Sequence, residues 1–88
     1  MRFAVWLLND EAIRRGVRHA VQFNYLWYPA PTEQQIRVMA EAILEGDCPE
    51  GHGPLDRERG GIPLGDVRAE MARCHACATY FRAEAITA

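Results

Sequence analysis

Two short stretches carry the most specific pattern of this chain: Cys-Pro-Glu-Gly-His at residues 48–52 and Cys-His-Ala-Cys at residues 74–77. The first stretch has a thiol and an imidazole at its two ends, and the second has a thiol at each end. Each pair can bend around a metal ion in a tight turn, and Zn²⁺ prefers four thiolate and imidazole ligands in a tetrahedron. We therefore expect one structural zinc ion, bound by Cys48, His52, Cys74 and Cys77.

The residues around these ligands favour the same interpretation. Pro49 fixes one backbone dihedral, and Gly51 permits the left-handed conformation that lets backbone amides approach a sulfur. The four ligands use all three cysteines of the chain, and an odd number of thiols would leave one outside any set of disulfides. Three alternatives stay open: an iron–sulfur or other metal site, cysteines buried as small apolar side chains, and His75 as a ligand in place of His52.

The length of 88 residues predicts a single domain, with an aromatic and helical part at 1–47 and a metal-binding part at 48–88. A domain this small buries little apolar surface, and a bound metal is a common source of further stability. The longest apolar run, residues 3–8, is too short to cross a bilayer. The N-terminus lacks a signal-peptide pattern, so we expect a cytoplasmic protein in a reducing compartment, where disulfides are rare.

The charged residues bear on the class of partner. All ten basic side chains are Arg and thirteen residues are Ala, a composition typical of a GC-rich genome such as that of an actinobacterium or one of its phages. The formal net charge is −2, and acids outnumber Arg by one in each part of the chain. Proteins that bind nucleic acid mainly through phosphates usually carry a basic surplus. The balance therefore favours a protein partner.

The clearest helix is predicted for residues 33–45. Thr32 is a good N-cap, and Gln35 completes a capping box with it. Apolar residues then recur at helical spacing as far as Leu44. Gly46 follows them and suits the C-terminal end of a helix. We expect this helix to pack against the aromatic N-terminal part.

The second half of the chain is predicted as loop and helix. Residues 46–54 are rich in Gly and Pro, and residues 56–65 have the composition of a loop. Asp66 can cap a short helix that runs toward Cys74. Residues 77–86 are mostly good helix formers, so we predict a final helix there.

Residues 1–28 are ambiguous between helix and strand. A polar cap and apolar residues on one face favour a helix over 10–23 that leads into an extended aromatic stretch. A strand pattern is shown instead by the strict alternation of Val21, Phe23, Tyr25 and Trp27. The predicted fold class is therefore small and mostly α with a zinc knuckle. The alternative is α+β with an N-terminal β-hairpin that pairs residues 2–8 with 20–28.

The two ligand pairs, followed by a predicted helix, resemble the zinc knuckle of treble-clef domains. They are similar in particular to the version found in HNH-type nucleases and related small proteins of actinobacterial phages. The similarity covers residues 48–86 and rests on the four ligands, Gly51 and the trailing helix. It implies a treble-clef-like fold around one structural zinc. HNH nucleases also need a catalytic His and a further Asn or His, and the eleven residues after Cys77 hold no such set, so nuclease activity is not expected.

Two groups of side chains are candidates for partner binding. One is a basic cluster beside His19, and the other belongs to a dense aromatic run. Arg, Trp and Tyr dominate interface hot spots, although a solvated helix face and a core position are the simpler explanations. The candidates are Arg14, Arg15, Arg18, Trp27 and Tyr28.

The sequence offers little support for catalysis. It contains no nucleophile–base pair and no phosphate-binding glycine loop, and four protein ligands would close the metal site to a substrate. We therefore expect a non-enzymatic regulatory protein that acts by binding another protein. The alternative is a DNA- or RNA-binding zinc module, for which the candidate phosphate contacts are Arg57, Arg59, Arg68, Arg73 and Arg82.

Overall fold

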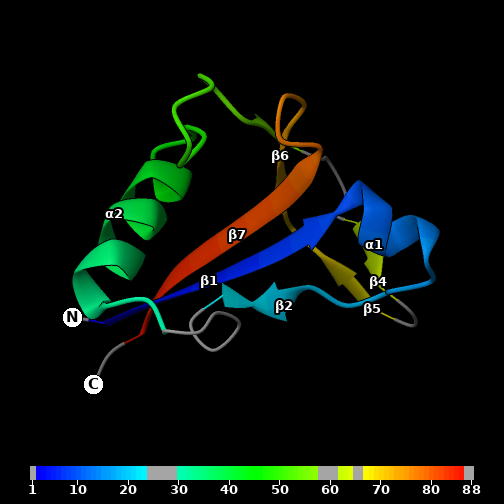
Figure 1. The fold of residues 1–88 in the computed structure, drawn as a ribbon, viewed down its shortest axis with the longest axis horizontal. Coiled ribbons are helices and arrows are strands. Elements are labelled where there is room, and N and C mark those ends of the chain that lie inside the picture. Colours follow the sequence, from blue (N-terminus) through cyan, green and yellow to red (C-terminus); the bar gives the residue numbers. More distant parts are fainter. Residues whose placement is uncertain (1, 24–29, 58–61, 65–66, 87–88) are drawn as a thin grey trace.

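The computed structural model describes residues 2–23, 30–57, 62–64 and 67–86. These residues form an α+β fold in which an antiparallel sheet carries a helix on one face (Figure 1). The elements in chain order are β1 (Arg2–Asn9), α1 (Asp10–Arg14), β2 (Val21–Gln22), α2 (Glu33–Leu44), β3 (Asp56–Arg57), β4 (Ile62–Leu64), β5 (Val67–Ala69), β6 (Ala72–Cys74) and β7 (Thr79–Ile86).

The centre of the main sheet is the pair formed by β1 and β7. The five strands lie in the order β2-β1-β7-β6-β3, and all neighbours are antiparallel. β1 and β7 pair along their whole length, from Arg2 opposite Ile86 to Asn9 opposite Thr79. β4 and β5 form a separate two-stranded sheet. The strands that come first and last in the described chain therefore lie side by side, as Figure 1 shows in blue and red-orange.

The core lies between α2 and the facing side of this sheet. Alternate residues of a strand point to opposite faces, so Val5 of β1 and Phe81 of β7 both point toward α2. Both are buried, and they form one apolar cluster with side chains from α2 and from the loop after it. The buried members of this cluster are Val5, Ile36, Ala40, Ile43, Cys48, Leu55, Cys74 and Phe81.

The prediction of a helix after Thr32 is confirmed, with an end one residue earlier than predicted. The Thr32 hydroxyl accepts a hydrogen bond from the Gln35 backbone N–H at 3.1 Å, and the Gln35 side chain accepts one from the Thr32 N–H at 2.8 Å. The helix ends at Leu44, and Gly46 follows with a φ of +90°. This is the left-handed conformation that favours glycine after a helix.

The predicted mostly α fold is wrong, because strands exceed helices in the described chain. The predicted final helix over 77–86 is instead β7, and the helix expected between Asp66 and Cys74 is replaced by β5 and β6. Helix propensities differ by at most about 0.7 kcal/mol per ordinary residue. Burial of the alternate residues Phe81 and Ala83 against β1 and α2 outweighs that preference.

The N-terminal segment also departs from the main prediction. The helix expected over 10–23 shrinks to the five residues of α1, and Gly16 follows in the left-handed region with a φ of +93°. β2 then pairs with β1, Trp6 opposite Gln22 and Leu7 opposite Val21. This pairing belongs to the alternative α+β prediction of an N-terminal hairpin, of which residues 24–28 lie outside the described chain.

The loop predicted for 56–65 is interrupted by two short strands, β3 and β4. None of the helices in the described residues is long and apolar enough to cross a membrane.

Candidate metal centre

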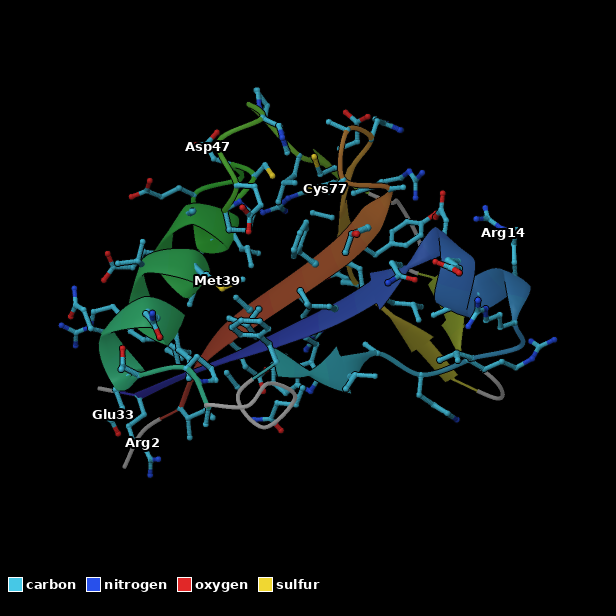
Figure 2. All side chains as sticks on the ribbon, viewed as in Figure 1. Arg2, Arg14, Glu33, Met39, Asp47 and Cys77 are labelled. Atoms are coloured by element: carbon cyan, nitrogen blue, oxygen red, sulfur yellow. The ribbon has the colours of Figure 1, made fainter. Side chains whose placement is uncertain are left out.

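The four predicted ligands come together at one end of the sheet. Cys48 and His52 lie in the loop after α2, while Cys74 ends β6 and Cys77 lies in the turn between β6 and β7. Their ligand atoms all lie within 4.8 Å of one another. Figure 2 shows Cys77 on the same side of the molecule as Asp47, a residue of the loop after α2. A group of three thiols and one imidazole is thus assembled from two segments far apart in the sequence.

The first ligand pair is held by a tight loop at residues 47–54. The Cys48 N–H donates to the Gly53 carbonyl at 2.8 Å, and the Gly51 N–H donates to the Cys48 carbonyl at 3.0 Å. Gly51 has a φ of +83°, which is the conformation that its position in the sequence predicts. The turn aims the N–H of Glu50 at the Cys48 sulfur, 3.4 Å away.

The second ligand pair lies in the hairpin turn at residues 75–78. The Cys77 N–H points at the Cys74 sulfur at 3.4 Å, in the same way as in the first loop. The turn closes with the Ala78 N–H donating to the His75 carbonyl at 3.2 Å, and Ala78 adopts a φ of +52°. Each ligand pair therefore brings one backbone amide to a cysteine sulfur, an arrangement that stabilises a thiolate.

The distances fit one tetrahedral ion. Zn–S bonds of about 2.3 Å and Zn–N bonds of about 2.0 Å give S···S edges of about 3.8 Å and S···N edges of about 3.5 Å. The sulfurs of Cys48 and Cys77 lie 3.7 Å apart. The Nδ1 atom of His52 lies 3.5, 3.1 and 3.7 Å from the sulfurs of Cys48, Cys77 and Cys74. The donor set therefore suits zinc, with Nδ1 as the imidazole ligand.

The pKa values of the thiols also favour binding of a divalent cation. Burial, together with the neighbouring thiols of Cys74 and Cys48, raises the pKa of Cys77 to about 12. Burial also acts to raise the pKa of Cys74, but hydrogen bonds from the backbone of Cys77 and Ala76 and from the other thiols lower it below its ordinary value. One thiolate is thus favoured and a second one beside it is opposed. A divalent cation would remove this conflict, because it stabilises all three thiolates.

A chain of polar side chains lies beside the second ligand pair. Arg73 donates two hydrogen bonds to the Asp10 carboxylate, at 2.7 and 2.8 Å, and its guanidinium lies 4.9 Å from the centre of the Tyr80 ring. The hydrogen bond from Arg73 holds the pKa of Asp10 below its ordinary value. The Arg73 Nε also donates to His75 Nδ1 at 3.2 Å, and His75 Nε2 contacts Asp56.

This polar chain contains His75, which was an alternative ligand, and the Arg73–Asp10 pair, which the sequence did not predict. His75 does not belong to the cluster of ligand atoms, so the alternative of His75 in place of His52 is wrong. The Arg73–Asp10 pair ties the second ligand pair to the start of α1. Sequence reasoning missed it, because the two partners are 63 positions apart and neither carries a local signal.

Three of the five predicted partner-binding residues belong to the described chain. Arg14, Arg15 and Arg18 are exposed on α1 and the segment after it, and Arg15 pairs with Glu11 at 2.8 Å. Trp27 and Tyr28 lie outside the described residues.

The four described Arg residues of the nucleic-acid alternative are spread over several elements. Arg73 and Arg82 lie on one face of the main sheet. Each lies opposite an aromatic residue of the neighbouring strand, Arg73 opposite Tyr80 and Arg82 opposite Trp6. Arg57 is exposed on β3, and Arg68 belongs to β5. Arg59 lies outside the described residues.

No protein-family model matches this chain, and neither the curated proteins nor the solved structures gave a match. The expected treble-clef arrangement is wrong, because Cys77 is followed by the strand β7 where a treble clef has a helix. What stands is a Cys₃His cluster, formed by Cys48, His52, Cys74 and Cys77, that could hold a metal ion such as zinc.

Proposed function

We propose that this protein is a zinc-stabilised module that binds nucleic acid and has no catalytic activity. The observation that carries the proposal is an Arg–aromatic contact on the face of the main sheet opposite α2. Trp6 of β1 lies directly across from Arg82 of β7, whose guanidinium is 6.0 Å from the ring centre. A second contact, between Tyr80 of β7 and Arg73 of β6 at 4.9 Å, lies beside the α1 segment, where Asp10 binds Arg73 and leaves its side chain 15% exposed. Aromatic rings and guanidinium planes are the groups on which proteins stack nucleic-acid bases.

Exposed cations lie beside this face. The segment that runs from α1 to β2 packs on it, because Ala12 and Ala20 contact the small buried cluster of Leu8 and Met71. Arg14 and Arg18 are exposed on the same segment, and Figure 2 shows Arg14 projecting away from the sheet. These side chains are placed to contact phosphates while the sheet contacts bases.

The long helix is unsuited to a nucleic-acid contact. Its buried stripe of Ile36, Ala40 and Ile43 packs on the sheet, so only its outer side is free. Glu33 and Glu41 are exposed, as is Glu45 at its end. Arg2 and Arg37 pair with Glu33 and Glu41, so this side has no surplus of cations to attract phosphates. The opposite face of the sheet is therefore the proposed contact surface.

In this proposal the metal has a structural role. Three thiolates and one imidazole fill the four positions of a tetrahedral zinc, so none is open for water or substrate. The ion would join the loop after α2 to the turn between β6 and β7. It would thereby fix the register of Arg73 and Tyr80, which lie in the strands that flank this turn.

Binding to labelled oligonucleotides tests the proposal. We expect a rise in fluorescence anisotropy at about 50 mM salt, and weaker binding at about 200 mM because counterions compete for the phosphates. The double variant Arg14→Gln/Arg18→Gln should weaken binding several-fold. The control Arg37→Gln also removes a positive charge, but from α2, and should leave binding unchanged. No binding of DNA or RNA at the lower salt concentration would refute the proposal.

A second candidate function is supported by a groove between α2 and β7, whose lining includes Met71 and Arg82. This groove has a volume of about 320 Å³ and lies between the end of α2, the loop after it and the edge of β7. Its lining combines apolar side chains with the charged residues Arg57, Glu70 and Arg82, and Leu44 at its side is 50% exposed. Such a surface suits an apolar side chain of a protein partner. A stoichiometric protein partner that binds the wild type but not Leu44→Asp would favour this function.

A further inference from the structure

We infer that the nucleic acid bound is single-stranded, and that an unpaired base stacks at the Trp6–Arg82 pair. This inference rests on the proposed function, because it names the ligand of the same sheet face. It adds two claims to the proposed function. The Trp6–Arg82 pair contacts a base rather than a phosphate, and the protein binds single strands more tightly than a duplex.

The sheet face opposite α2 is partly exposed along β7 at one end. Alternation along the paired strands puts one set of side chains on this face: Arg2, Ala4, Trp6 and Leu8 of β1, and Tyr80, Arg82, Glu84 and Ile86 of β7. Leu8 is 3% exposed, because Met71 and the α1 segment cover that end. Toward the other end, the side chains of Arg82 and Glu84 are 40% and 49% exposed and Ile86 is 41% exposed, whereas Ala4, opposite Glu84, is fully buried.

Arg82 is held in place before any ligand arrives. Its guanidinium donates to the Glu70 carbonyl at 3.2 Å and to the Glu84 carboxylate at 3.4 Å, and it lies over the Trp6 ring. A side chain ordered in this way loses little conformational entropy when a base stacks on it. The indole and the planar guanidinium together form a preorganised stacking platform.

The charges at this platform favour a base over a phosphate. Glu84 neutralises Arg82, so the Trp6–Arg82 pair has no surplus positive charge to attract an anion. Stacking does not require such a surplus, because every base has an aromatic face. Phosphate contacts would come from Arg18, which forms no ion pair among the described residues, and from Arg14.

The same surface does not suit a duplex. Bases of a duplex are stacked on each other, and their edges are reached by a helix or a two-stranded ribbon that enters the major groove. The Trp6–Arg82 pair lies in the middle of a sheet between β2 and β6 and cannot enter a groove. An unpaired base can approach it from solvent.

Intrinsic fluorescence reports on the platform directly. The chain has two Trp residues, so Trp27→Phe leaves Trp6 as the single indole. This variant would be titrated with a single-stranded DNA and a single-stranded RNA of about 12 nucleotides, and with a hairpin duplex of matching sequence. We expect the single strands to quench Trp6 fluorescence and to bind at least about tenfold more tightly than the duplex.

Substitutions at the platform separate stacking from folding. Trp6→Leu should weaken single-strand binding about tenfold, and Trp6→Phe should restore most of it, because a ring is present again. Arg82→Gln should also weaken binding. Circular dichroism and zinc content of each variant would establish that it is folded, and Arg37→Gln again serves as the control.

The outcomes distinguish this inference from the proposed function. If neither single strands nor duplex bind at about 50 mM salt, both fall together. If the duplex binds as tightly as the single strands, or if bound single strands leave Trp6 fluorescence unchanged, the inference is overturned and the proposed function stands. Quenching by single strands, with loss of affinity in Arg82→Gln, supports both.

Discussion

Single residues decide whether the two turns that carry the Cys₃His cluster can form. Gly51 and Gly53 adopt φ values of +83° and +95° in the first turn. Ala78 closes the second turn with a φ of +52°, and it is the one non-glycine residue with a positive φ among those that the structure describes. The left-handed conformation costs an L-residue roughly 1–2 kcal/mol, so Ala78 stores a small strain beside Cys77.

We predict that Ala78→Gly stabilises the protein. Glycine removes the strain, and the entropy that it adds to the unfolded chain offsets part of the gain. The expected net increase in the free energy of unfolding is about 0.5–1 kcal/mol, measured by urea denaturation of the zinc-loaded protein. Ala76→Gly in the same turn is the control, because Ala76 does not have a positive φ. Equal destabilisation by the two substitutions would show that Ala78 is not strained.

Spacing alone predicted the four ligands of the cluster, because two short Cys/His pairs can be recognised without knowing the fold. It did not predict which imidazole nitrogen faces the sulfurs, since both nitrogens of a His can bind metal. The Arg73–Asp10 pair could not be predicted either, because it depends on β6 and α1 meeting in space.

At the scale of elements, α2 is the part that the sequence predicts best and β7 the part that it predicts worst. The start of α2 is encoded locally in the capping box of Thr32 and Gln35. Residues 79–86 contain good helix formers, but Phe81 and Ala83 alternate with Tyr80 and Arg82 as a strand requires. That pattern was present, yet its significance depends on β1, whose apolar residues lie more than seventy positions earlier.

Packing of α2 on the sheet should contribute much of the folded-state stability. Ile43 is 8% exposed and belongs to the core, whereas Val38 on the same helix is 57% exposed. We predict that Ile43→Ala lowers the free energy of unfolding by about 2–4 kcal/mol, since it leaves a cavity in the core. Val38→Ala should change it by no more than about 0.5 kcal/mol. Similar losses in the two variants, measured by denaturation, would contradict this packing.

At the scale of the whole molecule, the metal cluster and the β1–β7 pair have complementary roles. The β1–β7 pair joins the two ends of the described chain, and the cluster joins the loop after α2 to the tip of the β6–β7 hairpin. Both are contacts between distant parts of the sequence. This explains why the fold class was mispredicted while the local motifs within it were found.

Zinc affinity should rise with pH. The pKa of Cys77 is about 12 without metal, so this thiol is protonated at neutral pH, whereas zinc binds the thiolate. Binding therefore releases protons, and a fall in pH weakens it by mass action. We expect release of about two to three protons per zinc near neutral pH, measured by calorimetric titration in buffers of different ionisation enthalpy. A pH-independent affinity would mean that the thiols do not bind the metal.

The most direct test of the central claim is the metal content of the purified protein, measured by elemental mass spectrometry. We predict about one zinc per chain in the wild type and in His75→Gln, whose imidazole lies outside the cluster. In Cys74→Ser we predict loss of zinc together with the circular dichroism of the folded state. A folded, monodisperse wild-type protein without zinc would contradict the account, since Cys48, Cys74 and Cys77 would then be core residues rather than ligands.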